Sequence, residues 1–391
     1  MFLAVDMAKN QYRVGLMFSI TGAYSIVACS MLNGALLAIE EVNRASGAFG
    51  LHPVVVDPGG NLQEYSAQSA KLLKSGVRHV IGCYTSSSRK EVIPCFEKYD
   101  GLLWYPSHYE GFESSTNVIY TGAAPNQHIL PLIDHLVTHF GPRAFCIGSN
   151  YIWAWENNRI LRETISAQGG SVLAERYLAV GDTELDQMVA AILEARPSFV
   201  FSSLIGVSAY VFFRKFRAAC LALGIDQPNE IPVASCNLSE PELAEIGDEA
   251  VDGHLSSSVY FSSLPSDCNK AFVADYARRF PDQPLTSADA EASYIAVKLL
   301  GMAIGIAGTD EVGAVKAAVT ERWFEAPQGD VMIDQTTMHS HLTPRIGRSK
   351  RGASFDVIME DKAPISPDPY LVRSGARYAT PNSRANLWVA N

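Results

Sequence analysis

Residues 144–205 read AFCIGSNYIWAWENNRILRETISAQGGSVLAERYLAVGDTELDQMVAAILEARPSFVFSSLI, and this stretch decides the class of fold. Short apolar runs alternate in it with longer segments whose apolar residues recur at helical spacing. The last run is apolar almost throughout, which is typical of a strand buried on both faces of a parallel sheet. The repeated order of strand and helix predicts an α/β domain. The expected strands are Ala144–Ser149, Val172–Tyr177 and Phe199–Ile205, and the expected helices are Trp153–Ala167 and Glu184–Ala195.

A similar series precedes this one, so the pattern predicts two such domains. Its expected strands are Tyr12–Ile20, Pro53–Asp57, Val77–Cys83, Leu102–Pro106 and Val118–Gly122, and its expected helices are Cys29–Asn43, Leu62–Lys74 and Ser88–Tyr99. The second series opens with an expected helix at Gln127–Phe140 and ends with Val207–Leu223 as a helix and Ile231–Ser235 as a strand.

The last third of the chain breaks the alternation. Helices are expected at Ser266–Arg279 and Ala288–Ile306, and short strands with turns from Gln328 to Asp361. We interpret these pieces as returning to complete both domains, which gives a hinge with several crossovers and a cleft between two doubly wound parallel sheets. The expected domains are residues 1–124 with 257–330, and residues 125–256 with 331–391. Ligands of such sheets bind at the carboxyl ends of the strands.

Composition narrows the class of partner. The 391 residues are 48% hydrophobic and 18% charged, with 31 basic against 41 acidic residues and a net charge of −10. Such a chain can build large cores, and its acidity argues against direct binding of nucleic acid or an anionic membrane. The seven cysteines form no CxxC pair, and Cys83 and Cys146 are expected to be buried thiols. No apolar run long enough to span a membrane is expected. The start MFLAVDMAKN lacks the pattern of a leader, which favours the cytoplasm, or the periplasm if a leader has been removed.

Motifs of catalysis and metal binding are weak here. The chain has no GxGxxG, P-loop or GxSxG motif, and the SxxK pattern from Ser87 lacks its usual companions. His135 and His139 have metal-ligand spacing, but a partly solvated helix face explains them better. His339 and His341 form an HxH pair in a region of strands and turns, with no third ligand in sequence. The basic run from Arg345 to Arg351 is interpreted as a solvated hairpin tip. We therefore expect no catalytic set, no metal and no cofactor.

Three loops after strands carry the candidate binding chemistry. They read CYTSSSR (83–89), WYPSHYEGF (104–112) and SNYIWAWE (149–156). Hydroxyl side chains at a helix start and rings with polar tips suit a small pocket that is mostly apolar. The alternatives are helix capping alone for the first loop and plain aromatic packing for the other two.

The motifs IGCYTSSSRKEVIP, LLWYPSHYEGFE and NVIYTGAAPNQ, between residues 81 and 127, closely resemble AmiC-type amide sensors. These sensors are cytoplasmic relatives of the type I periplasmic binding proteins, and urea-binding components of ABC transporters share a similar segment. The resemblance extends over nearly the whole chain. It implies a short aliphatic amide bound between two lobes, and an RNA-binding antiterminator protein as the regulated partner.

The resemblance also implies binding residues. They are Tyr84 and Ser86 in the first loop, Tyr105 and Ser107 in the second, and Tyr151 in the third. Two departures add polar capacity: His108 stands where the sensors have Pro, and Asn237 lies in a segment that is Thr-rich in the sensors. Both leave room for urea or another polar amide.

We expect a cytoplasmic sensor that closes on a short amide or urea and thereby controls its antiterminator partner; a homo-oligomer is left open. The alternative is the solute-binding component of an ABC transporter for urea, short-chain amides or branched-chain amino acids. An amidase is a third interpretation, and no arrangement of nucleophile and base supports it.

Overall fold

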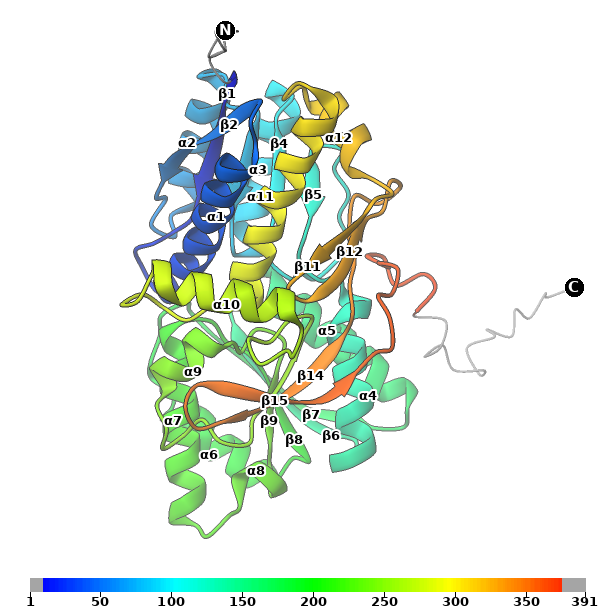
Figure 1. Cartoon of the computed structure of the whole chain (residues 1–391). Helices are drawn as coiled ribbons and strands as arrows, with labels where there is room; N and C mark the ends of the chain where they lie inside the picture. The colour runs from blue at the N-terminus through cyan, green and yellow to red at the C-terminus, as the bar shows by residue number, and fades with distance from the viewer. Residues whose placement is uncertain (1–9, 375–391) are drawn as a thin grey trace, which may run out of the picture.

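The computed structural model describes residues 10–374, which form two α/β lobes stacked one above the other (Figure 1). The interpretation of the first residues as lacking a leader concerns residues 1–9, outside the described part. The same holds for the last residues of the expected second domain, 375–391.

The first lobe is built on a sheet of five parallel strands in the order β2-β1-β3-β4-β5. Its strands are β1 (Asn10–Met17), β2 (Phe49–Val56), β3 (His79–Gly82), β4 (Leu102–Tyr105) and β5 (Val118–Tyr120). Its helices are α1 (Ser25–Ala45), α2 (Leu62–Lys74), α3 (Ser86–Tyr99), α10 (Asp267–Arg279), α11 (Ala288–Ala307) and α12 (Val312–Val319). A small antiparallel sheet, β11 (Trp323–Ala326), β12 (Gly329–Ile333) and β13 (Ser340–His341), follows them in the chain.

The second lobe is built on a sheet of seven strands in the order β15-β14-β10-β9-β8-β6-β7. The strands are β6 (Arg143–Ser149), β7 (Ser171–Leu178), β8 (Phe199–Ser203), β9 (Val233–Ser235), β10 (Leu255–Ser258), β14 (Arg345–Lys350) and β15 (Ser354–Glu360). β14 and β15 are antiparallel, so this sheet is parallel only from β10 to β7. The helices are α4 (Ile129–Phe140), α5 (Ile152–Ala167), α6 (Asp186–Ala195), α7 (Val207–Ala222), α8 (Gln227–Glu230) and α9 (Glu240–Ile246), with a 3-10 turn η1 (Pro125–Gln127) before α4.

The chain crosses between the lobes repeatedly. It leaves the first sheet after β5, returns after β10 to add α10–α12 to the first lobe, and ends in the β14–β15 hairpin of the second sheet. The predicted two-lobe α/β fold with a hinge of several crossovers is therefore confirmed.

Helices α1 and α11 pack against each other as the core of the first lobe. A side chain on Gly34 of α1 would lie 2.2 Å from the carbonyl oxygen of Ala290, so glycine permits this close approach. Both helices are long and apolar enough to cross a membrane by length and composition, and 56% and 72% of their most apolar windows are buried inside the protein. The expectation that no apolar segment is long enough to span a membrane was wrong. In this structure both helices are packed in the protein core.

Two local expectations were also wrong. The helix expected at Gln127–Phe140 is interrupted at His128, whose backbone is not helical. Arg345 is not solvated: its guanidinium is buried, donating hydrogen bonds to the carbonyl oxygens of Val259 and Gln328 and pairing with Glu360 at 2.7 Å. Buried thiols at Cys83 and Cys146 are confirmed.

Candidate functional site

Three small cavities lie between the two lobes, at the carboxyl ends of the parallel strands, and His108 lines all three. Their volumes are about 10, 10 and 20 Å³, so each has room for about one water molecule. The lobes thus meet closely in this structure. We name the cavities by a residue that distinguishes each: the Trp153 cavity, the Glu240 cavity and the His128 cavity.

The Trp153 cavity brings together every predicted binding residue except Tyr105. It is lined by Tyr84, Ser86, Ser107, His108, Tyr151, Trp153, Ile205 and Asn237. Both lobes contribute, since the first four come from loops after β3 and β4, and the others from loops of the second sheet. The structure therefore brings six of the seven predicted side chains together around this cavity. Their part in ligand binding stays a prediction.

Tyr105 lies behind the cleft. Its hydroxyl donates to the backbone carbonyl of Tyr84 at 2.8 Å, and its ring lies 4.7 Å from the Arg89 guanidinium. It is fully buried and lines none of the three cavities. Neighbouring residues of a strand point to opposite faces of the sheet, and Trp104 and Tyr105 accordingly belong to different cores.

Ser86 is held by a buried group of charges. Its hydroxyl donates to Glu110 Oε2, and the Arg89 guanidinium lies 3.3 Å from Ser86 Oγ and 2.9 Å from Glu110 Oε1. Glu113 and Lys90 complete the group, with Arg89 Nε 2.7 Å from Glu113 Oε1 and Lys90 Nζ 2.7 Å from Glu113 Oε2. Because the hydroxyl hydrogen points at Glu110, Ser86 presents a lone pair, an acceptor, to a ligand.

The hydroxyl of Ser107, like that of Ser86, is oriented by a carboxylate, here that of Asp289. Its hydroxyl donates to Asp289 Oδ1 at 2.7 Å, and His108 Nδ1 lies 3.7 Å from the same oxygen. Burial raises the pKa of Asp289 to about 7 and lowers the pKa of His108 to about 4, so the imidazole is neutral near pH 7. Asp289 lines the Glu240 and His128 cavities, where it offers a further acceptor.

Asn237 is held in place by hydrogen bonds of both atoms of its side-chain amide. Its amide nitrogen donates to the Leu204 carbonyl at 2.9 Å, and its amide oxygen accepts the Ser235 hydroxyl at 2.6 Å. The first of these bonds joins the loops after β8 and β9. Tyr84 lines the Trp153 cavity, and its ring centroid lies 5.4 Å from that of Tyr24.

Two buried side chains that sequence reasoning missed have polar atoms without partners at these cavities. The indole nitrogen of Trp153 has no hydrogen bond within residues 10–374, and it can only donate. His128 Nε2 donates to the Tyr109 carbonyl at 3.0 Å, and burial lowers its pKa to about 3. Nδ1 of this neutral ring is therefore an acceptor, and it too lacks a partner in the described chain. Buried polar atoms of this kind mark places for ligand atoms or water.

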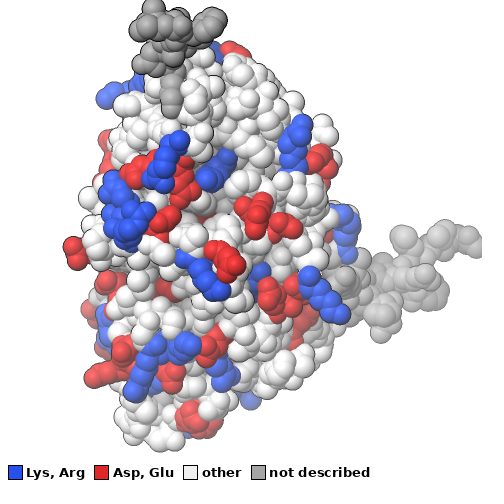
Figure 2. Space-filling model, in the orientation of Figure 1, with Lys and Arg blue, Asp and Glu red and all other residues white. Residues whose placement is uncertain are grey.

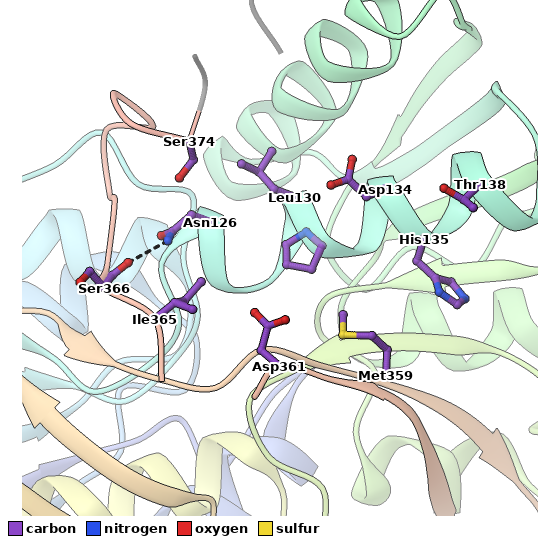
Figure 3. Close-up of a pocket in the computed structure, with 11 residues that line it drawn as sticks. Asn126, Leu130, Asp134, His135, Thr138, Met359, Asp361, Ile365, Ser366 and Ser374 are labelled. Carbon is purple, nitrogen blue, oxygen red and sulfur yellow. Dashed lines mark hydrogen bonds between the residues drawn. The ribbon is translucent and has the colours of Figure 1, made fainter. Parts of the chain in front are cut away.

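A larger hollow than these three cavities lies elsewhere on the described chain. It is a groove on the second lobe, between α4, the end of β15 and the segment around Ser366 (Figure 3). Its volume is about 590 Å³. Asn126 donates to the Ser366 carbonyl at 2.9 Å at its rim, and His135 and His139 stack on α4 with ring centroids 4.2 Å apart. No predicted binding residue lines this groove. On the face shown in Figure 2, Lys and Arg are interspersed with Asp and Glu.

The two lobes and the polar cavities between them define a bilobed α/β binding protein. The chain belongs to the family of the periplasmic binding protein domain, which matches residues 12–375, and it has the type I fold of that family. It is 21% identical over 341 residues to the leucine-, isoleucine-, valine-, threonine- and alanine-binding protein of Pseudomonas aeruginosa, covering 85% of this chain and 88% of that protein.

Two further relatives are also binding proteins. A Leu/Ile/Val-binding protein of Rhizobium johnstonii is 20% identical over 327 residues, covering 82% of this chain and 86% of that protein. A solved solute-binding protein of an ABC transporter from Rhodopseudomonas palustris, in complex with p-hydroxybenzoic acid, superposes with a TM-score of 0.83 at 19% identity, covering 93% of this chain and 100% of that one. These relatives are binding proteins rather than enzymes.

Proposed function

We propose that this protein is the solute-binding component of an ABC transporter and that its solute is a short amide or urea. The transporter role is supported by the kind of relative found, namely binding proteins for amino acids and for a hydroxybenzoate. It replaces the amide sensor as the leading interpretation, since no relative among them is a regulator. It also implies a place outside the cytoplasmic membrane and a membrane-embedded partner, in place of the cytoplasm and an antiterminator.

The observation that carries the choice of solute is the hydrogen-bonding pattern of the cleft. Ser86, Ser107, Asp289 and His128 present acceptors, and Trp153 presents a donor. A primary amide or urea has the complementary pattern, with one carbonyl oxygen and two or four N–H groups. The carbonyl oxygen would face Trp153, and the N–H groups would face the acceptors.

A carboxylate solute fits this pattern poorly. Among the described residues, no lysine or arginine lines the three cavities, and the nearby Arg89 is bound to Glu110 and Glu113. A carboxylate would meet the Asp289 carboxyl group and lose hydration without gaining a cation. The three neighbouring cavities together have room for only about three waters, which favours a solute of few atoms over a branched-chain amino acid or an aromatic acid.

Calorimetry with purified protein tests the solute. We expect acetamide, propionamide and urea to bind, and leucine and p-hydroxybenzoate to bind at least tenfold more weakly. Trp153→Phe should weaken amide binding by about 1–3 kcal/mol, because the carbonyl loses its donor. Trp155→Phe is the matched control, since Trp155 is 45% exposed and its indole donates to Asn150 at 3.1 Å. Tighter binding of leucine than of any amide would overturn the proposed solute.

A cellular experiment tests the transporter role separately. Deletion of the gene should abolish uptake of labelled urea or acetamide at low concentration. If uptake is unchanged and amide-induced gene expression is lost instead, the protein is a sensor and the transporter role is wrong.

A further inference from the structure

Two buried acids line the cavities of the cleft, Asp289 and Glu240, and Glu240 accepts the backbone N–H of Ser262 at 2.6 Å. Glu110 is paired with Arg89 at 2.9 Å. Glu291 accepts two hydrogen bonds from Gln328, and Glu242 accepts from the backbone and hydroxyl of Ser239. Asp289 is 4% exposed, and it accepts the Ser107 hydroxyl and its own backbone N–H. Within residues 10–374 it forms no ion pair with lysine or arginine, and its one imidazole neighbour, His108, is neutral.

Asp289 shares the Glu240 cavity with Tyr260, whose buried hydroxyl has no partner among the described residues, and no lysine or arginine lines either of its cavities. It shares the His128 cavity with the unpartnered acceptor Nδ1 of His128, and Ser107 has its hydrogen directed at the carboxylate. Asp289 lies in the first turn of α11, where the helix dipole favours a negative charge. Burial opposes the ionisation of Asp289, and a ligand that carries a positive charge and only N–H donors compensates the ionised carboxylate best.

We propose that the cleft also binds the planar cations that are isosteric with its neutral solutes, acetamidinium and guanidinium, with Asp289 as their counter-ion. This inference rests on the proposed binding of amides and urea, because it uses the same cavities. In a cation of this type an NH₂ group replaces the carbonyl oxygen, so every polar atom of the ligand is a donor.

Trp153 and Asp289 then have opposite effects on the two kinds of ligand. The indole N–H of Trp153 favours a carbonyl oxygen and opposes an NH₂ group in the same place. Asp289 accepts from either ligand, but its charge favours the cation. The two side chains come from different lobes, Trp153 from the start of α5 and Asp289 from the start of α11. They line different cavities that share His108, so a ligand that spans these neighbouring cavities contacts both.

Competition calorimetry with isosteric pairs tests the proposal. At pH 8, above the pKa of Asp289, acetamidinium and guanidinium chloride at millimolar concentration should displace acetamide and urea, whereas sodium chloride at equal ionic strength should not. Asp289→Asn keeps an acceptor for Ser107, and we expect it to weaken acetamidinium binding at least 30-fold and acetamide binding less than fivefold. Trp153→Phe should weaken acetamide binding and leave acetamidinium binding unchanged or tighter.

Glu291→Gln is the control, because Glu291 is a buried acid in the same first turn of α11 that lines none of the cavities, and Gln can keep its contacts with Gln328. It should change cation binding less than threefold. If acetamide or urea binds and neither cation displaces it from the wild type, this inference fails and the proposed solute stands. If neither the neutral solutes nor the cations bind, the proposed solute itself fails. The wild-type competition decides the matter even if Asp289→Asn does not fold.

Discussion

The backbone N–H of Val207, the first residue of α7 in the second lobe, donates a hydrogen bond of 3.2 Å to the carbonyl oxygen of Ala23, just before α1 in the first lobe. Gly206 makes this contact between lobes sterically feasible. A Cβ atom there would lie 2.0 Å from the Ala23 carbonyl oxygen, and the backbone has a φ of +59°. The closed arrangement therefore depends on a glycine at this position.

Gly206→Ala should hold the lobes apart. A ligand that contacts both lobes binds through the closed state, so an obstacle to closure lowers its apparent affinity. We expect acetamide or urea affinity to fall more than tenfold, and small-angle scattering to give a larger radius of gyration with saturating ligand than the wild type has. Gly224→Ala is the control, because Gly224 has a φ of +68° and a Cβ atom added there would meet no other atom within 4 Å. Equal affinity in the Gly206 variant and the wild type would mean that this contact does not limit closure.

Ser86→Ala should weaken amide or urea binding by about 1–3 kcal/mol, because a ligand N–H loses its acceptor in a closed site. Helix α3 should remain intact, since Thr85 is its N-cap and accepts from the Ser88 N–H at 3.2 Å. Ser87→Ala is the matched control, because Ser87 lines none of the cavities. Calorimetry and thermal unfolding measure the two effects. A large fall in melting temperature with unchanged affinity would make Ser86 a structural residue only.

Local patterns of sequence predicted most of the fold. The all-apolar strand near Phe199 and the amphipathic helices around it carry their own periodicity, so their class and order follow from the chain. Short strands were expected between Gln328 and Asp361 in the second lobe, where β14 and β15 lie, but their antiparallel pairing was not. The short strand Leu255–Ser258 was not predicted at all. A strand reading LSSS has little hydrophobic signal, and it is held by neighbours far along the chain.

The candidate site was predictable only where one loop carries it. Tyr84, Ser86 and Ser107 follow strands directly, and the topology of parallel sheets brings such loops together. Asp289 contacts Ser107 across 182 residues of sequence, and nothing in the segment around it distinguishes it from an ordinary acidic residue in the first turn of a helix. Trp153 lies in a loop that was already a candidate, but its missing hydrogen-bond partner is a property of the packed structure. Tyr105 lies outside the three cavities, because the side to which a strand-end residue points depends on register, and its part in binding stays a prediction.

Tyr105→Phe should separate packing from binding. Its hydroxyl bonds to the Tyr84 carbonyl and not to the cavities, so its loss should destabilise the fold by about 1 kcal/mol and change ligand affinity less than twofold. Tyr151→Phe makes the comparison, since Tyr151 lines the Trp153 cavity from the other lobe. Thermal unfolding and calorimetry of both variants are the measurements. A loss of affinity in Tyr105→Phe greater than that in Tyr151→Phe would return Tyr105 to the binding site.

Buried acids should make the protein less stable as the pH rises above neutrality. Burial raises the pKa values of four carboxyl groups to about 7 or 8, namely Glu240, Glu242, Asp289 and Glu291. Unfolded carboxyl groups titrate near pH 4, so between about pH 4.5 and 8 the folded state binds more protons and its stability falls with rising pH. Five buried histidines have the opposite effect on stability below pH 6.5. Burial lowers their pKa values to about 3 or 4, so the unfolded chain binds more protons there and stability falls as the pH falls. They are His79, His108, His128, His254 and His339.

Glu291→Gln isolates one of these acids, and it tests the pH effect in a range where the histidines no longer titrate. The pKa of Glu291 is raised by burial to about 8, so ionising it between pH 7 and 9 should cost the folded wild type about 1 kcal/mol, a loss that the variant avoids. Gln328 can accommodate the new amide, because its own amide oxygen is buried without a partner among the described residues and can accept after the side chain flips. Thermal unfolding at a series of pH values is the measurement, since urea and guanidinium are candidate ligands and unsuitable as denaturants. Glu245→Gln, at an exposed position on α9, should keep the wild-type dependence. Parallel curves for the wild type and Glu291→Gln between pH 7 and 9 would show that Glu291 does not carry a proton in the folded state at neutral pH.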